Sequence, residues 1–205
     1  GSCIYHLGLR LLWRYVAGRQ RPSALGSHFP RLPKISKKVG PREQVRIHVC
    51  WGNYAGPHHH DIAAAEIWPV VAKVKAQFIL TEAANPRHAQ DAKAFEDACA
   101  RGLFEAPKVI VPGVIDTTAA RVEHPALVAE RLLRFVKAVG HPSRVIAGTD
   151  CGMATTAKSS AITSDIAWLK LEALVEGAAR ATKMLLEVCA LVPLPGREPN
   201  AAPCG

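Results

Sequence analysis

Short strand-like runs alternate with amphipathic helical runs from about residue 45 onward. The strand-like runs are 45–50, 77–81, 108–111 and 144–148, and the helical runs are 60–76, 88–101, 124–139 and 164–186. Strands that alternate with helices form a parallel sheet with right-handed crossovers, because a parallel pair needs a long connection across one face. The pattern therefore predicts an α/β fold with four βα units.

Metal-ligand types of side chain follow three of these strand-like runs. His48 and Cys50 end the first run, Glu82 follows the second, and Cys151 follows the fourth. Side chains two positions apart on a strand point to the same face, so His48 and Cys50 leave the strand together. Residues that follow parallel strands gather at one edge of the sheet. Imidazole, thiolate and carboxylate are the donors that zinc prefers, so the sequence predicts a Zn²⁺ site made by these four side chains.

Other interpretations of the same residues stay open at this point. Ordinary buried thiols are the alternative for Cys50 and Cys151. An ion pair with Arg87 is the alternative for Glu82. Trp51 and Trp168 are interpreted as packing residues.

The net charge of +9 comes from one end of the chain. Residues 1–42 contain nine Lys or Arg and no Asp or Glu, whereas the rest contains 17 basic and 17 acidic residues. We expect 1–42 to be a disordered leader or foreign to the domain, with a targeting or membrane-surface segment as the alternative. The domain is expected at 43–187, followed by a disordered Pro- and Gly-rich tail at 188–205. A balanced domain argues against nucleic-acid binding.

The six cysteines have no regular spacing, in a chain long enough to fold without disulfides. A reducing, cytoplasmic compartment is therefore expected. No apolar run reaches the length of a membrane-spanning helix, so no membrane partner is expected.

Six short motifs occur in a characteristic order. They are RIHVCWGNY (46–54), GPHHHDI (56–62), EAANPRH (82–88), PGVIDTT (112–118), VEHP (122–125) and AGTDCG (147–152). With them, residues 43–180 resemble the cobalamin-independent methionine synthase superfamily. The resemblance is strongest to proteins of the methionine synthase II, or 5-methyltetrahydropteroyltriglutamate–homocysteine methyltransferase-like, type. Epoxyalkane:coenzyme M transferase is in the same group.

The resemblance implies the C-terminal half of a TIM-type (β/α)8 barrel, because family members are complete barrels. It implies Zn²⁺ as cofactor, held by the same four residues that the spacing selects. It also implies methyl transfer from a methyl-folate-like donor to a homocysteine-like thiol, in methionine biosynthesis. One alternative is transfer of another alkyl group to another thiol such as coenzyme M. Another is a truncated, non-catalytic zinc-binding fragment that needs a partner half-barrel, or that self-associates through open barrel edges.

Two further groups of residues are candidates for the site. His58, His59 and His60 precede a helix and are expected on the substrate side of the site, although a histidine run is also typical of a metal-binding tract. Asp116 lies on a loop after a strand and is expected to contact substrate and take part in catalysis. Turn formation is the alternative for Asp116.

Asp150 and Thr118 complete the expected site. Asp150 directly precedes Cys151 and is a second candidate catalytic residue, which would orient a ligand or satisfy loop amides. Thr118 stands where the methionine synthases proper have an acid–base histidine. Because a hydroxyl does not titrate near neutral pH, thiol alkylation in general is a firmer implication than folate-dependent methylation.

Overall fold

Five parallel strands form one sheet in the order β1-β2-β3-β4-β5. The computed structural model describes residues 3–8, 45–154 and 162–191. The strands are β1 (Cys3–Gly8), β2 (Val45–Cys50), β3 (Phe78–Thr81), β4 (Val109–Ile115) and β5 (Gly148–Thr149). The helices are α4 (Ala64–Val71), α5 (Asp91–Ala100), α6 (Pro125–Val139) and α7 (Ser164–Leu191), with a 3₁₀ turn η2 (Pro142–Arg144). The four predicted βα units are therefore confirmed.

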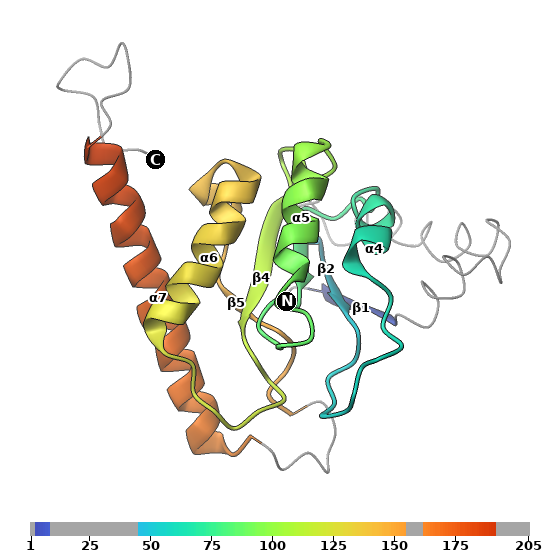
Figure 1. Cartoon of the computed structure of the whole chain (residues 1–205), viewed down its shortest axis with the longest axis vertical. Coiled ribbons are helices and arrows are strands. Elements are labelled where there is room, and N and C mark those ends of the chain that lie inside the picture. The colour runs from blue at the N-terminus through green and yellow to red at the C-terminus, as the bar shows by residue number, and fades with distance from the viewer. Residues whose placement is uncertain (1–2, 9–44, 155–161, 192–205) are drawn as a thin grey trace, which may run out of the picture.

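The helices cover one face of this sheet. Figure 1 shows α4, α5 and α6 side by side in front of the strands, with α7 lying along α6. On β2, Val45, Ile47 and Val49 are fully buried in the core under the helices. Because strand side chains alternate, His48 and Cys50 face the other side of the sheet. The expectation that these two side chains leave β2 on the same face is thus confirmed.

Four aromatic rings join the helical layer into one core. The Phe95 ring lies 5.9 Å from Trp68, 4.9 Å from Phe104 and 5.2 Å from Phe135 between ring centroids. These residues come from α4, from α5 and the turn after it, and from α6. Edge-to-face and offset ring contacts add to the gain from apolar burial. This cluster holds the helices, and so the strands beneath them, in fixed relative positions.

Helix α6 is capped at both ends. The His124 side chain accepts a hydrogen bond from the Ala126 amide, and Pro125 occupies the first turn. Gly140 ends the helix at φ 80°, in the left-handed conformation that glycine adopts without strain. The helical run expected over 124–139 therefore ends where the sequence predicts.

Other boundaries differ from the sequence prediction. Helix α4 is eight residues long rather than extending over 60–76, and Pro69 inside it removes one helical N–H donor. Strand β4 continues through Pro112 and Gly113 to Ile115, and its register shifts between Gly113 and Ile115 on the β5 side. The fourth strand comes later than 144–148, because the chain at Pro142–Arg144 forms a 3₁₀ turn.

Strand β1 lies in the leader and was not anticipated from the sequence. Its six residues pair in parallel with β2, from Cys3 opposite Val45 to Gly8 opposite Cys50. Disorder is therefore the wrong expectation for Cys3–Gly8. Residues 1–2 and 9–42 of the predicted leader, and 192–205 of the predicted tail, lie outside the described residues. The division into leader, domain and tail stays a prediction.

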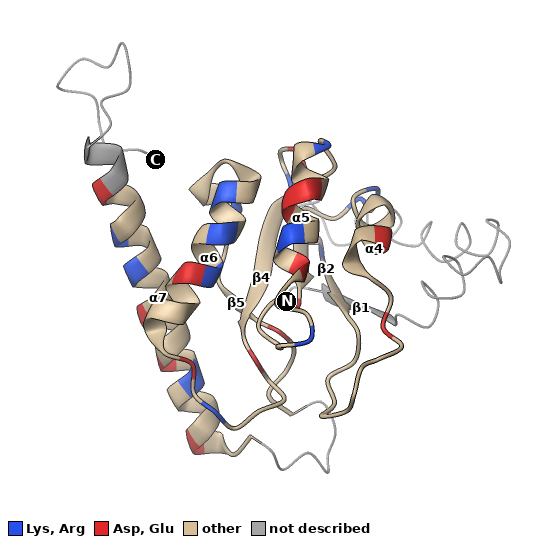
Figure 2. Cartoon of the chain, viewed as in Figure 1, with Lys and Arg blue, Asp and Glu red and all other residues tan. Residues whose placement is uncertain are grey.

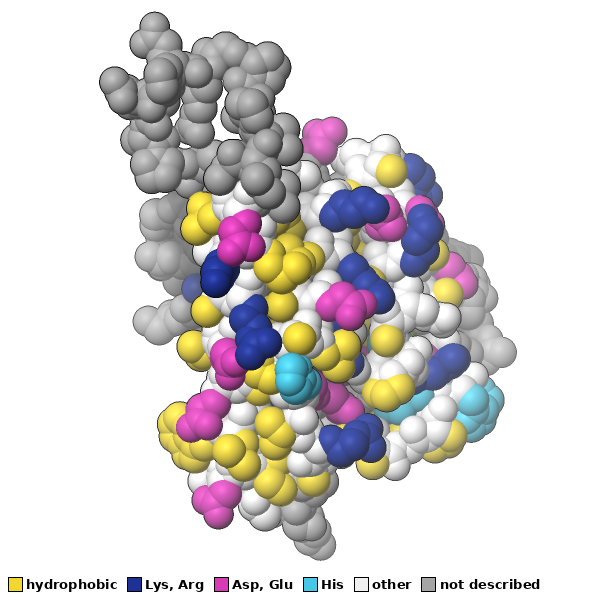
Figure 3. Space-filling model, turned by 60° about the vertical axis from the view of Figure 1, so that its left-hand side comes forward, with side chains coloured by type: hydrophobic (Ala, Val, Ile, Leu, Met, Phe, Trp, Pro, Cys, Tyr) yellow, Lys and Arg dark blue, Asp and Glu magenta, His cyan; other side chains and the backbone are white. Residues whose placement is uncertain are grey.

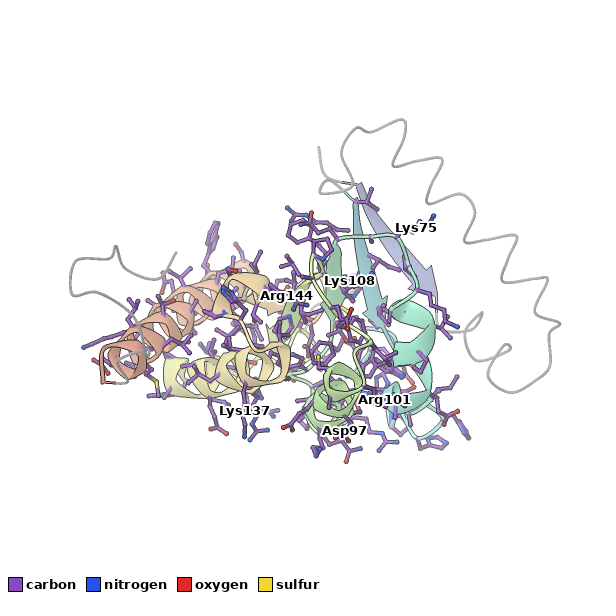
Figure 4. All side chains as sticks on the ribbon, turned by 90° about the horizontal axis from the view of Figure 1, so that it is seen from above. Lys75, Asp97, Arg101, Lys108, Lys137 and Arg144 are labelled. Atoms are coloured by element: carbon purple, nitrogen blue, oxygen red, sulfur yellow. The ribbon has the colours of Figure 1, made fainter. Side chains whose placement is uncertain are left out.

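Lys108 and Arg144, which precede β4 and β5, donate hydrogen bonds to backbone oxygens. The Lys108 ammonium donates to Val74 O at 2.7 Å, and Arg144 Nε donates to Lys108 O at 2.9 Å (Figure 4). Elsewhere, acidic and basic residues are interspersed over the helices, as Figure 2 shows. In the part of the chain that the structure describes, no helix is both long and apolar enough to cross a bilayer.

Candidate functional site

His48, Cys50, Glu82 and Cys151 converge at the carboxyl ends of the strands. The side-chain donor atoms of His48, Cys50 and Cys151 all lie within 4.8 Å of one another. His48 Nε2 is 3.3 Å from Cys151 Sγ, and the Cys151 thiol donates to Glu82 Oε1 at 3.2 Å. The four come from β2, from just after β3 and from just after β5. Residues up to 103 positions apart in the chain are therefore brought into contact, as the spacing predicts.

The protonation of the two thiols is linked. Their hydrogen bond lowers the pKa of Cys50 to about 4, against the opposing effect of burial. The same hydrogen bond, with burial and the nearby Glu82 carboxylate, raises the pKa of Cys151. Without a metal the pair thus holds one thiolate and one thiol. Burial also raises the pKa of Glu82, which the Cys50 thiolate reinforces. A cation placed among these groups would relieve their mutual repulsion.

The donor set fits a four-coordinate zinc ion. Zinc binds sulfur at about 2.3 Å and nitrogen or oxygen at about 2.0 Å, so tetrahedral ligands lie about 3.5 Å apart. The measured separations of 3.3 Å from His48 Nε2 to Cys151 Sγ and 3.2 Å from Cys151 Sγ to Glu82 Oε1 are close to that value. The Glu82–Arg87 pair is not formed. Glu82 Oε2 instead accepts from the Trp51 amide at 3.4 Å, while Arg87 Nε donates to His58 O at 3.2 Å.

Asp150 joins the loop after β3 to the loop after β5. Its carboxylate accepts hydrogen bonds from the amides of Ala83 and Ala84, both at 2.9 Å, and of Asn85 at 2.7 Å. Burial raises the pKa of Asp150 to about 7, and these three amides oppose that shift. Because the neighbours of Asp150 are Cys151 in sequence and the Glu82 loop in space, its geometry is that of a positioning residue. The expected satisfaction of loop amides is observed, and a catalytic role for Asp150 stays a prediction.

Asp116 is buried at the end of β4. Its Oδ1 accepts from both the amide and the hydroxyl of Thr118 at 2.7 Å, and its own amide donates to Glu123 at 2.8 Å. Asp116 lines a pocket of about 200 Å³ together with Arg121, Glu123 and Arg131. Asp116 therefore both forms a turn interaction and lines a pocket. Its role toward substrate stays a prediction.

The three consecutive histidines separate in the structure. His58 is buried, with 3% of its surface exposed, and contacts Asp61. His59 and His60 are exposed, and their rings lie 3.8 Å apart between centroids. The substrate-side role expected for all three stays a prediction.

Several residues of the site region were missed by sequence reasoning. Asn53 Nδ2 donates to Gly152 O at 3.0 Å and Asn53 Oδ1 accepts from the Thr117 hydroxyl at 2.9 Å, so one side chain bridges two strand-end loops. Glu123 Oε2 forms an ion pair with Nζ of the fully buried Lys170 of α7, at a distance of 3.0 Å. The motifs given above contain Asn53, Thr117 and Glu123. Membership of a motif was therefore the signal that could have identified these three residues. Lys170 lies in the helical run 164–186, and no sequence pattern in that run distinguishes it as a buried residue.

Gly113 is needed for the close approach of β4 to the Asp150 loop. A Cβ at this position would lie 2.3 Å from Asp150 Oδ1 and 2.5 Å from its Cα. We expect Gly113→Ala to displace Asp150 and Cys151, to weaken any zinc binding by the cysteine-containing site, and to cost roughly 1–3 kcal/mol of stability. Zinc affinity measured by competition with a chelator tests this. Gly140→Ala, far from any contact, should lose some stability through its φ of 80° yet keep wild-type zinc affinity.

Comparisons with known proteins agree with this geometry. The family model described as the catalytic domain of cobalamin-independent synthases matches residues 33–178. A search of curated proteins found no match. A B12-independent methionine synthase from Shewanella sp. W3-18-1, solved in complex with selenomethionine, is 22% identical with a TM-score of 0.51.

That match covers 70% of this chain and 40% of the solved one, so the chain spans about two fifths of the similar structure's length. At this identity the likeness shows the fold, and the predicted half of a TIM-type barrel is confirmed. The family model covers well over half of the sequence. The chain belongs to the cobalamin-independent synthase catalytic-domain family, a family of methyltransferase-like enzymes.

Proposed function

We propose that this chain takes part in zinc-dependent transfer of a methyl group to a substrate thiol, of the homocysteine S-methyltransferase type. The observation that carries the proposal is the contact of Cys151 Sγ with both His48 Nε2 and Glu82 Oε1, at 3.3 and 3.2 Å. Thiolate donors favour zinc over hard cations. Membership of a methyltransferase-like family supplies the reaction class.

His48, Cys50 and Cys151 would hold the zinc ion throughout. When bound, zinc keeps a substrate thiol deprotonated at neutral pH, whereas a free thiol with a pKa of about 8.5 is mostly protonated. Glu82 is the ligand that we expect to give way to substrate, because a carboxylate is a harder donor than a thiolate. Burial also raises the pKa of Glu82, so burial favours the neutral form of this carboxyl group.

Other side chains would position the substrate. The pocket beside Asp116 also contains Arg121 and Glu123, so it offers both signs of charge to an amino acid with an ammonium and a carboxylate group. Asp150 would act through the amides of the Glu82 loop rather than on the substrate. The partners we propose are a homocysteine-like thiol and a methyl-folate-like donor, with neither nucleic acid nor membrane, in the cytoplasm.

Cobalt substitution gives a direct test of thiol binding. Co²⁺ bound by thiolates absorbs through sulfur-to-metal charge transfer, and a third sulfur ligand should intensify that band. We expect homocysteine to intensify it and methionine, whose sulfur is already methylated, to leave it unchanged. A response to coenzyme M but not to homocysteine would favour the alternative alkyl transfer. No response to either thiol by the metal-loaded chain would contradict the proposal.

A second candidate, zinc binding without catalysis until another half-barrel is present, is favoured by the surface of α7. Trp168 and Val175 are 65% and 70% exposed, so packing is the wrong expectation for Trp168. Figure 3, with the α7 side turned forward, shows hydrophobic side chains on this face among charged ones. Methionine formation assayed across a size-exclusion profile separates the candidates. Activity confined to associated species supports the second, and activity of the monomer supports the first.

A further inference from the structure

We propose that His58, Asp61 and His88 form a second binding site for a divalent transition metal such as Zn²⁺, separate from the cysteine-containing site. His58 Nδ1 lies 2.7 Å and His88 Nε2 lies 2.9 Å from the same oxygen, Asp61 Oδ2. The donor atoms of the three residues all fall within 4.8 Å of one another. Two imidazoles and one carboxylate are a recurrent set of ligands for zinc and iron. We call these residues the histidine–aspartate cluster.

The outer nitrogen of each imidazole is held as it is in metal-binding histidines. His58 Nε2 lies 3.0 Å from the backbone oxygen of Tyr54, and His88 Nδ1 lies 2.9 Å from Asp91 Oδ2. Both partners are acceptors, so each outer nitrogen can donate the ring N–H to its partner. A neutral imidazole then points its lone pair inward, toward the common point at Asp61. Anchoring the outer N–H to a carbonyl or carboxylate is the arrangement that orients metal-ligating histidines.

The donors and acceptors of the cluster leave a place for a cation between the two imidazoles and Asp61. With both rings neutral, two inward lone pairs would face a carboxylate oxygen, which is repulsive. Without a metal, therefore, the buried cluster must take up additional protons to satisfy all its contacts. A dication would satisfy both nitrogens and Asp61 at once. Its charge would balance the two carboxylates, Asp61 and Asp91.

Aromatic rings stack on both histidines of the cluster, and Asp61 is its most exposed member. The Trp51 ring stacks on His88 at 4.3 Å, and the Tyr54 ring stacks on His58 at 4.1 Å. His58 has a φ of 50°, a conformation that non-glycine residues keep only when their surroundings impose it. The histidine side chains are 3% and 4% exposed, whereas that of Asp61 is 13% exposed. An ion could therefore enter past the carboxylate.

The proposed role of this metal is to order the loop between β2 and α4. That loop begins with Trp51, whose ring contacts His88, and contains Asn53, which binds the carbonyl of Gly152. Gly152 directly follows Cys151. A metal in the histidine–aspartate cluster would thus fix a loop that contacts Glu82 through the Trp51 amide and the residue after Cys151 through Asn53. The inference does not depend on the proposed methyl transfer.

The test removes competing sites first. In a Cys50→Ser/Cys151→Ser background the thiolate site is lost, and adding His59→Ala/His60→Ala removes the exposed histidines as adventitious ligands. We expect this full-length variant to bind about one equivalent of Zn²⁺ by calorimetric titration. Adding Asp61→Ala should abolish that binding. Uptake of less than a few tenths of an equivalent, or binding that survives Asp61→Ala, overturns the proposal.

Two further measurements keep the test decisive if Asp61→Ala does not fold. Asp91→Ala removes only the partner of the outer nitrogen of His88, and should weaken binding in the same background about 10- to 100-fold. The wild-type chain should bind two equivalents of Co²⁺, one with sulfur charge-transfer absorption and one without it. A wild-type chain that binds a single equivalent contradicts the second site.

Discussion

Cys151→Ser is expected to abolish zinc binding at the cysteine-containing site. Cys151 Sγ contacts both His48 Nε2 and Glu82 Oε1, so its loss breaks the contacts that close the donor set. Loss of a hydrogen-bond partner of a metal ligand costs about 10- to 100-fold in affinity, and loss of the ligand itself should cost more than about 100-fold. The Co²⁺ charge-transfer band, which reports thiolate ligands only, gives the measurement.

A matched control is available on helix α5. Cys99 is half-buried, and burial raises its pKa to about 11, so it behaves as an ordinary core thiol. Cys99→Ser should keep the wild-type Co²⁺ spectrum and zinc affinity.

Zinc should also stabilise the wild-type chain. The gain is about 4 kcal/mol at a free concentration 1,000 times the Kd, because the unfolded chain lacks the assembled site. Cys151→Ser should lose the part of that gain that comes from the cysteine-containing site. An unchanged Co²⁺ charge-transfer band in Cys151→Ser would refute the proposed metal site.

Lys170→Met is expected to have the largest effect on stability. Lys170 is fully buried, donates to Arg121 O, and lies 3.0 Å from Glu123 Oε2, whose side chain is 8% exposed. Removing one partner of a buried ion pair leaves the other charge uncompensated, which costs about 3–5 kcal/mol. Glu123 also accepts from the Asp116 amide, so the loop after β4 should loosen as well. Urea unfolding measures the change.

Two variants show whether the effect comes from the buried charge. Lys183 is exposed on the same helix and lies 3.9 Å from Glu187, so Lys183→Met should change stability by well under 1 kcal/mol. Lys170→Met combined with Glu123→Gln should recover part of the loss, because no buried charge is then left alone. A loss below about 1 kcal/mol in Lys170→Met would show that this ion pair does not stabilise the fold.

Periodicity in the sequence accounts for much of the sheet and the cysteine site. Val45, Ile47 and Val49 mark the face of β2 toward the helices, which leaves His48 and Cys50 on the other face. Glu82 and Cys151 follow other strands, and parallel strands bring their carboxyl ends together. These are local regularities that a chain keeps wherever it packs. They were sufficient to group four residues spread over about 100 positions.

Boundaries were less predictable, because they depend on neighbouring strands and helices. Pro112-Gly113 is a turn signal in isolation, yet β4 continues through it because Thr81 of β3 pairs with Pro112 and Gly113 pairs with Gly148 of β5. Strand β1 was missed for the same reason. A six-residue run in a basic leader becomes a strand only because the edge of β2 is beside it.

The sequence by itself determined the βα alternation and which side chains stand at the strand ends, because both follow from a repeat of two or 3.6 residues along the chain. Only the tertiary structure decided what those ends contact. Three contacts of this kind are those of Asp150 with the loop amides, of Lys170 with Glu123, and of His88 with Asp61. They join residues 27 to 67 positions apart in the chain. The His58–Asp61 contact is local by comparison. The three longer-range contacts depend on how loops and helices pack in three dimensions, and no local period of the sequence records that.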